Sequence, residues 1–453
     1  MDRVSKTLAE YITSIDYSKV PLETRHEVKR RIIDSVAVAM AAYTAEPVAL
    51  SRRMAAKFSI RGGPRIIGTS YRTTPELAAF VNGLMIRYHD YNDTYLSKEP
   101  LHPSDLIAAA LSIGEYVDAR GTDLITAVAL GYEISVTFCD GGTLRKRGWD
   151  HVNFLGLGSV SAAAKLLALD IEKIRHALAL YAVPHAAMRQ TRVGELSMWK
   201  GAAAANASRN AVFATLLAKE GFTGPYKPFE GEMAFFKQLL HGDFDYSVFA
   251  RIENREQPRR ILDTYIKPYP VEYHAQTAVD AALKLREKVR IEEVEKIVID
   301  TYEAAYTIIG PKDPEKWDPH TRETADHSLM WITAAALVWG PIKISHYKNV
   351  RDPTVLSLMK KIEVRLDPEL DKIYPKAFPT VITIVTKSGA KYTERVDYAK
   401  GHPKNPMTDR ELEEKYHELT IDYLPEEVRN TALKIMWQIE KYEIKDLLDA
   451  LTV

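Results

Sequence analysis

Residues 201–221 read "GAAAANASRNAVFATLLAKEG", and this stretch decides the fold class. Alanine has the highest helix propensity of the amino acids, and here it recurs without any proline. Small side chains also let many helices pack closely against one another. The stretch therefore predicts a long helix inside a buried multi-helix assembly.

The same helical pattern fills the chain from its start to about residue 250. Apolar residues repeat every three to four positions in alanine-rich segments at 26–43, 76–88, 106–119, 123–138, 160–169 and 171–183. No fixed repeat of 30 to 45 residues is visible, which argues against a solenoid. We therefore expect a large all-α domain over residues 1–265.

The pattern changes after a polar, proline-bearing connector at 254–270. β-Branched runs predict strands at 295–302, 361–366, 380–386 and 391–396, with helical segments at about 274–289 and 323–338. The last two strands flank "KSGA", which is typical of a hairpin turn. We expect a smaller α+β domain over 266–404, after which helices at 405–453 rejoin the first domain.

The totals exclude several classes of function. Lys and Arg total 61 and Asp and Glu also total 61, which argues against a nucleic-acid partner. The single cysteine, Cys139, rules out a disulfide framework, a structural zinc site built on cysteines and a cysteine-held iron–sulfur cluster. The N-terminus lacks a signal-peptide pattern, and apolar runs such as "LIAAALSIG" are too short to cross a bilayer. These features predict a cytoplasmic protein without a membrane partner.

The stretch "RYHDYNDTYLSKEPLHPSD", residues 87–105, is unusually polar for a connection between helices. It could be a solvated loop, a metal site or the proton-transfer half of an active site. The pair His89-Asp90 invites a metal-dependent HD-type hydrolase. However, zinc spacing of the HExxH kind is absent from the whole chain. His102, followed by Pro-Ser-Asp, is the residue that stands out.

Further clusters of histidine or lysine precede apolar helical segments. They are His151 before "GLGS", Lys200 before the alanine run, Lys267 and His274 in "KPYPVEYH", and Asp326, His327 and Ser328 before "LMWITAAALVWG". Amides at a helix start favour an anion, but close helix packing explains the glycines equally well. Helix capping could likewise explain the last cluster.

Taken in order, four motifs resemble the 2-methylcitrate dehydratase family of the MmgE/PrpD type, which also includes cis-aconitate decarboxylase. The motifs are "DYNDTY…HPSD", "WKGAAAANASRNAVFATLLAKEG", "KPYPVEYHAQTAVDAAL" and "TRETADHSLMWITAAALVWG". The resemblance runs from about residue 25 to residue 340. It implies a large all-α domain, a small α/β lid-like domain, an active site between them and a homodimer. It implies no metal and no organic cofactor.

The resemblance also carries individual residues. Asp90, Thr94, His102, His151 and Lys200 match catalytic positions of the family, and Lys267, His274 and His327 match the substrate-binding segments. Asn92 stands where the family has an aspartate, and the gap before His102 is slightly stretched. The "ETADHSL" form is closer to the dehydratases than to the decarboxylases.

Dehydration of 2-methylcitrate removes a proton alpha to a carboxylate and expels a tertiary hydroxyl. Histidines suit both proton transfers because their pKa lies near working pH. We therefore expect His102 and His151 to form the acid–base pair, with Asp90 orienting an imidazole. Lysines such as Lys200 and Lys267 are expected to hold the carboxylates of a tricarboxylate substrate. Which histidine is the base stays open.

Three alternatives remain open. One is a cis-aconitate decarboxylase, or another lyase or isomerase of a polycarboxylate. A second is the metal-dependent HD-type hydrolase, whose activity would vanish with a chelator. The third is a helical scaffold that has kept the fold without catalysis, although all the matched histidines and lysines are present.

Overall fold

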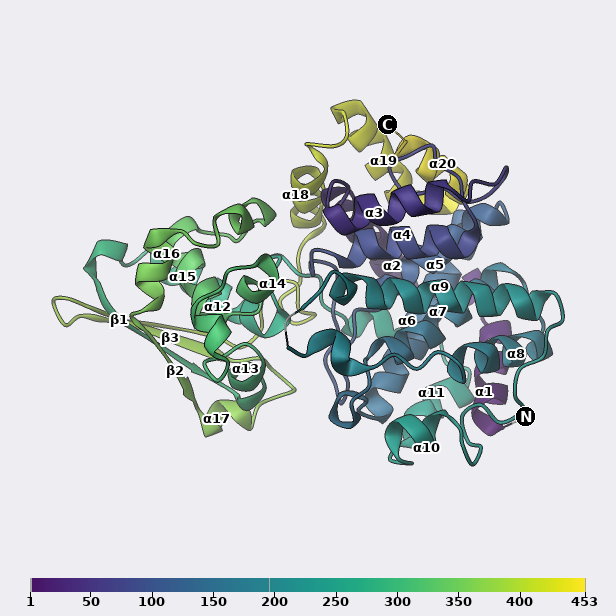
Figure 1. Cartoon of the computed structure of the whole chain (residues 1–453), viewed down its shortest axis with the longest axis horizontal. Helices are drawn as coiled ribbons and strands as arrows, with labels where there is room; N and C mark the ends of the chain where they lie inside the picture. The colour runs from purple at the N-terminus through teal and green to yellow at the C-terminus, as the bar shows by residue number, and fades with distance from the viewer. Residues whose placement is uncertain (1, 195, 453) are drawn as a thin grey trace. The chain divides into compact units, whose positions relative to one another are not determined.

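The computed structural model describes residues 2–194 and 196–452, which form two compact units. The residues up to Tyr265, together with those from Thr408 onward, are here called the helical unit (Figure 1). Ile266–Met407 are called the α+β unit. The prediction of a mainly helical chain is confirmed, whereas the description of the smaller unit as a lid stays a prediction.

The helical unit contains no named strand among its described residues. Its helices are α1 (Arg3–Ser14), α2 (Leu22–Ala41), α3 (Glu46–Ala56), α4 (Pro75–Arg87), α5 (Ile107–Tyr116), α6 (Gly121–Gly141), α7 (Val152–Leu166), α8 (Ile171–Ala182), α9 (Trp199–Lys219), α10 (Phe235–Leu240), α11 (Ala250–Glu253), α18 (Asp409–Thr420), α19 (Glu426–Trp437) and α20 (Ile444–Ala450). Both ends of the chain belong to this unit (Figure 1).

The alanine-rich helix α9 lies at the centre of the packing, as the sequence predicts. It contacts α4, α7 and α8, and the alanines at 204, 205 and 211 are fully buried. A Cβ atom at Gly83 of α4 would lie only 3.0 Å from the Cα atom of Ala205. The two backbones approach this closely because neither side chain is larger than a methyl group.

Helix α6 is longer than the apolar runs in the sequence suggest. It spans Gly121–Gly141 and is long and apolar enough to cross a membrane by length and composition alone. The expectation that every apolar run is too short is therefore wrong for this helix. Its most apolar window is 94% buried inside the structure, where α6 packs on α7. In the described chain, the bent pair α2 and α3 also passes that test if it is counted as one span.

The α+β unit is built on a sheet of order β2-β1-β3-β4. Its elements are α12 (Gln276–Arg286), β1 (Val294–Thr301), α13 (Glu303–Ile308), α14 (Arg322–Ala325), α15 (Leu329–Trp339), α16 (Pro353–Met359), β2 (Ile362–Leu366), α17 (Pro368–Asp371), β3 (Thr380–Thr386) and β4 (Lys391–Val396). Strand β1 pairs with β2 in parallel and with β3 antiparallel, and β3 and β4 form the predicted hairpin. Helix α12 packs on β3 and β4, and α15 packs on α12.

One predicted helix of this unit is interrupted. The segment 323–338 forms α14 and α15, separated at Asp326–Ser328. The Ser328 hydroxyl accepts a hydrogen bond from the backbone N–H of Trp331 at 3.1 Å and so caps α15. Capping, which was one of the two readings of this cluster, therefore accounts for Ser328.

Candidate functional site

Asp90 occupies an unusual backbone position just after the end of α4. Its φ angle is +50°, in the left-handed region that residues other than glycine rarely adopt. Its backbone N–H donates to the carbonyl of Arg87 at 3.0 Å, and the Arg87 guanidinium lies 2.9 Å from the Asp90 carboxylate. Both side chains are buried. Backbone strain of this kind is found at functional sites, where the surrounding structure holds a group in place.

His102 and Lys200 converge on the carboxylate of Asp90. Nε2 of His102 lies 3.9 Å from Oδ1, and Nζ of Lys200 lies 3.8 Å from Oδ2. Lys200 is in the first turn of α9, where a cation is unfavourable for the helix dipole. The negative charge of Asp90 offsets this cost. The structure thus brings together three of the predicted site residues, Asp90, His102 and Lys200.

The two predicted acid–base histidines are neighbours. The ring centroids of His102 and His151 are 5.7 Å apart, and the rings meet edge to face. Nδ1 of His102 lies 2.8 Å from the backbone carbonyl oxygen of Asp93. Because a carbonyl only accepts, Nδ1 carries the proton, and Nε2 is the nitrogen that faces Asp90.

His151 lies directly before α7 and is oriented by the preceding residue. Its Nδ1 lies 3.1 Å from Oδ1 of Asp150, whose other oxygen lies 3.0 Å from Nε of Arg192. Burial, followed by the charge of Arg192, lowers the pKa of His151 to about 3. Nε2 of His151 is buried and has no hydrogen-bond partner among the described residues. The imidazole is therefore neutral, with its free lone pair on Nε2.

Burial alone would raise the pKa of the Asp150 carboxyl, but the positive charge of Arg192 and the His151 ring reverse the effect, so that this pKa is lowered. Its Oδ1 also accepts the backbone N–H of Val152 at 3.2 Å, in the first turn of α7. Asp150 is thus a buried, ionised carboxylate that holds the proton of His151 on Nδ1.

Asn92 links two parts of the polar stretch to each other. Its side-chain amide donates to the Ser104 hydroxyl and to the Asp105 carboxylate, both at 2.8 Å. Burial raises the pKa of Asp105 to about 7, and the nearby Arg87 opposes that rise. An aspartate at position 92 would instead place a second carboxylate against Asp105.

Thr94 holds the loop in place through its side chain and its backbone. Its hydroxyl donates to the carbonyl of Leu101 at 3.1 Å. Its backbone exchanges two hydrogen bonds with Tyr265, at 2.9 and 2.8 Å. The neighbouring Asp93 accepts from the Tyr132 hydroxyl at 2.7 Å, so this part of the loop is fastened to α6.

Close packing accounts for the glycines that follow His151. A Cβ atom at Gly156 would lie 1.8 Å from the hydroxyl of Tyr181, and one at Gly158 would lie 2.6 Å from the backbone carbonyl of Gly131. These close approaches favour helix packing over anion binding as the reason for the glycines in "GLGS". Small residues are needed here so that α7 can contact α6 and α8.

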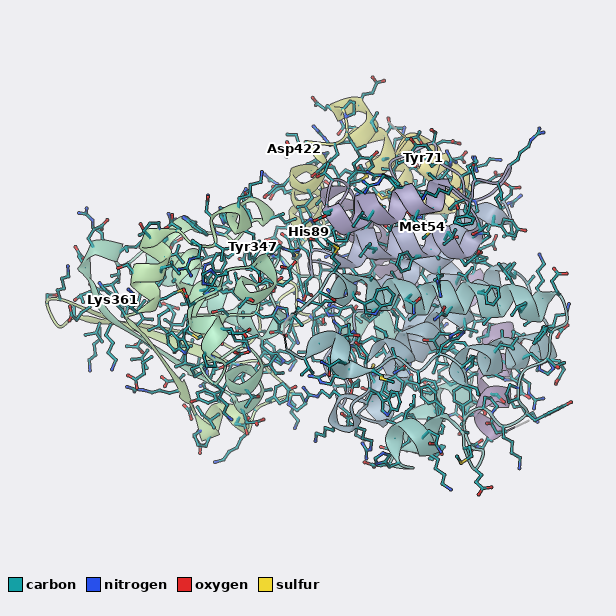
Figure 2. All side chains as sticks on the ribbon, viewed as in Figure 1. Met54, Tyr71, His89, Tyr347, Lys361 and Asp422 are labelled. Carbon is teal, nitrogen blue, oxygen red and sulfur yellow. The ribbon has the colours of Figure 1, made fainter. Side chains whose placement is uncertain are left out.

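His89 has a different environment from the one the HD reading requires. It follows the end of α4 (Figure 2), and its Nε2 bonds to the backbone carbonyl of Ala41 at 3.1 Å. Its ring also packs on Tyr88. Over residues 2–194 and 196–452, no group of three or more His, Cys, Asp or Glu side chains is placed to hold a metal ion. His89 and Asp90 thus have separate partners, the Ala41 carbonyl for His89 and the Arg87 guanidinium for Asp90.

The substrate-binding candidates of the α+β unit have other surroundings. Lys267 is 1% exposed. Nδ1 of His274 lies 2.5 Å from the Tyr302 hydroxyl, and Tyr302 stacks on Tyr374. His327 contacts the carboxylate of its neighbour Asp326.

Several residues of the site were missed by sequence reasoning. They are Arg87, Asp105, Asp150 and Arg192. Two of them could have been predicted from the sequence, because Arg87 is the first residue of the polar stretch and Asp150 directly precedes His151. Arg192 lies in the segment "MRQTRVGELS", which has no periodicity or motif, so only the fold reveals its role.

Comparison with known proteins finds a family model for each part of the chain. The MmgE/PrpD N-terminal domain matches residues 6–247, and the MmgE/PrpD C-terminal domain matches residues 269–441. The 2-methylcitrate dehydratase of Escherichia coli (strain K12) is 28% identical over 378 residues, covering 76% of this chain and 75% of the relative.

Two further relatives differ in their names. Alkylcitrate dehydratase phiI of Fungal sp. (strain ATCC 74256) is 29% identical over 79% of this chain and 75% of its own length. The cis-aconitate decarboxylase of Homo sapiens is 25% identical over 93% of this chain and 89% of its own length. At the level of the family, these names confirm the expectation of a lyase-type enzyme. Because the two domain matches together span most of the sequence, the chain belongs to the MmgE/PrpD family.

Proposed function

We propose that this protein is a cofactor-independent hydro-lyase that converts 2-methylcitrate, or citrate, into the corresponding cis-aconitate. The observation that carries the proposal is the pair His102 and His151, 5.7 Å apart and each beside its own carboxylate. The names of the relatives support the substrate class.

His151 is the base in this proposal. Its Nδ1 faces Asp150, so the lone pair is on the buried Nε2. A neutral imidazole in this environment accepts the proton alpha to a substrate carboxylate. As the proton leaves, negative charge spreads onto that carboxylate, and the imidazolium that forms is stabilised by Asp150.

His102 is the acid that protonates the departing hydroxyl. The carboxylate of Asp90, 3.9 Å from Nε2, supplies the negative charge that an imidazolium needs. The carbonyl of Asp93 holds the other nitrogen in place. Water is then the leaving group, and the electron pair of the broken C–H bond forms the new double bond.

Cations stabilise the charge that develops on the substrate. Lys200 has its ammonium group 3.8 Å from Asp90, beside the acid. By motif match, Lys267, His274 and His327 are proposed to bind the remaining carboxylates. Preorganised positive groups of this kind contribute a large part of the rate enhancement when carboxylate charge develops.

We further propose that the protein is a cytoplasmic homodimer. Gel filtration coupled to light scattering would measure its oligomeric state.

Decarboxylation of cis-aconitate is the second candidate. It is favoured by the human relative, which aligns with 93% of this chain. The same pair of histidines could move the protons that this reaction requires. The two reactions differ in the bond that breaks, which is C–O in one and C–C in the other.

A substrate panel tests the proposal. Purified protein is given 2-methylcitrate, citrate and cis-aconitate, with and without a chelator. New double-bond absorbance without carbon dioxide, unaffected by the chelator, is the expected result. Gas release from cis-aconitate supports the second candidate. Activity that is lost with the chelator and restored by a divalent ion would contradict cofactor independence.

A further inference from the structure

The polar loop of residues 87–105 forms a closed turn between Thr94 and His102. Tyr95 and Leu101 exchange two backbone hydrogen bonds, at 2.8 and 2.9 Å, which close the turn over residues 96–100. Glu99, at the tip of this turn, is completely buried. A buried carboxylate is costly unless donors surround it, so its partners show what the turn is fastened to.

Glu99 fastens the turn to the segment that leads to His151. One carboxylate oxygen accepts the backbone N–H groups of Leu144 at 2.7 Å and Arg145 at 3.0 Å, and the Thr143 hydroxyl at 3.1 Å. The backbone N–H of Glu99 also donates to the carbonyl of Cys139, in the last turn of α6, at 3.1 Å. The other carboxylate oxygen has no partner within the described part of the chain.

Both fastened segments end on an acid–base histidine. On one side, Glu99 is three residues before His102. On the other side, the carbonyl of Leu144 accepts the N–H of Trp149 at 3.2 Å, two residues before His151. The carboxylate of Glu99 is therefore a direct connection between the two loops that carry the histidines.

We infer that Glu99 is a positioning residue that sets the distance between the His102 and His151 rings. The inference rests on the proposed function for its catalytic meaning, but the distance itself is a property of the fold. Small errors in such a distance have large effects, because a displacement of about 1 Å can cost about a hundredfold in rate.

The charge on Glu99 has a pH dependence of its own. Burial raises its pKa to about 7, while the backbone N–H groups of Arg145 and Leu144 oppose the rise. The other groups with charge or acidity that interact with it are the Arg145 and Arg189 guanidiniums and the Cys139 thiol, whose pKa burial raises. An ionised carboxylate is the stronger acceptor, so the fastening is tightest above pH 7.

Two variants separate positioning from general stability. Glu99→Gln keeps a carbonyl oxygen for the three donors, whereas Glu99→Ala removes the acceptor. Glu414→Gln, a surface change on α18 where the side chain is 62% exposed, is the matched control. Crystal structures of wild type, E99Q and E99A would measure the ring separation, and kcat and KM would be measured from pH 6 to pH 9.

We expect E99A to change the ring separation and to lower kcat about tenfold or more at an unchanged KM. E99Q should keep the ring separation and most of the wild-type kcat at pH 8. The kcat of wild type should change near pH 7, where Glu99 titrates, and the kcat of E99Q should lack this change. An unchanged separation in E99A, or a kcat in E99A equal to that of E414Q, would overturn the inference. If wild type turns over no substrate of the panel while E99A still alters the separation, the proposed function fails and the positioning role stands.

Discussion

The helical unit and the α+β unit both contain buried histidines, but they surround them with different chemistry. In the helical unit, His151 lies against the ionised Asp150 and has a free Nε2 atom. In the α+β unit, His274 bonds to a tyrosine hydroxyl and packs near Tyr374. A group that exchanges a proton during turnover needs a charged partner for its charged form. Under the proposed function, acid–base chemistry is therefore assigned to the helical unit and substrate binding to the α+β unit.

Removing the histidines of the helical unit should have the largest effect. We expect His151→Gln and His102→Gln each to lower kcat by about 10²–10⁴-fold, because each loses one proton transfer. Steady-state kinetics with the substrate found by the panel would measure this. Near-normal turnover in H102Q would remove that residue from the mechanism and weaken the comparison between the units.

Removing the carboxylate behind His151 should have the next largest effect. Asp150→Asn still fills the space but no longer stabilises the imidazolium, so we expect kcat to fall by roughly one to two orders of magnitude. The control is Asp243→Asn, a surface aspartate that pairs with Arg147. An effect no larger than that of D243N would show that Asp150 has only a structural role.

The α+β unit should respond in KM rather than in kcat. Lys267→Met and His274→Gln should each raise KM about tenfold with kcat changed only a fewfold, because a contact made in both the ground state and the transition state is lost. Lys296→Met, at an exposed pair with Glu363, is the matched control. A large loss of kcat in H274Q would give that histidine a chemical role and contradict the proposed division of roles between the two units.

Besides the exposed His320, which lies beside Asp318, His327 of the α+β unit also has a carboxylate neighbour, Asp326. Its side chain is 21% exposed, against 8% for that of His151. We expect His327→Gln to behave like the binding variants, with a change of a fewfold in KM. A kcat loss as large as that of H151Q would extend the acid–base chemistry to the α+β unit.

The smallest effect on turnover is expected for Asp105→Asn, whose main consequence is on stability. The pKa of Asp105 is raised to about 7, so between pH 4 and pH 7 the folded protein keeps a proton that the unfolded chain releases. Its contribution to the free energy of unfolding is therefore complete below pH 4 and is lost as the pH rises through 7.

The D105N variant lacks this titration. Its Tm relative to wild type should rise from pH 5 to pH 8, by the equivalent of roughly 4 kcal/mol at most. Thermal unfolding at several pH values would measure this. A difference in Tm that does not depend on pH would show that Asp105 is not titrating in this range.

Patterns that repeat along the chain were readable from the sequence, and long-range contacts were not. The alanine run predicted α9, and β-branched alternation located all four strands to within about two residues. The break between α14 and α15 was missed because Ser328 ends one helix pattern and caps the next within a continuous apolar run. The length of α6 was missed because Glu133 interrupts its apolar pattern, although that side chain is buried and paired with Arg251.

The same distinction between local patterns and long-range contacts applies to the candidate site. His102, His151 and Lys200 could be named from local motifs, and the structure brings two of them to Asp90. Arg192 could not be named, because nothing in its own segment indicates that it reaches Asp150. Local motifs thus named the candidate reactive groups, whereas the residues that surround them depend on the fold.

Hydrogen exchange at the carbon next to the substrate carboxylate tests the assignment of the two histidines most directly. Substrate is incubated in D₂O with H102Q or H151Q, and deuterium at that carbon is measured by NMR. If His151 is the base, H102Q should incorporate deuterium without forming the double bond, and H151Q should incorporate none. Incorporation by H151Q but not by H102Q would contradict the assignment.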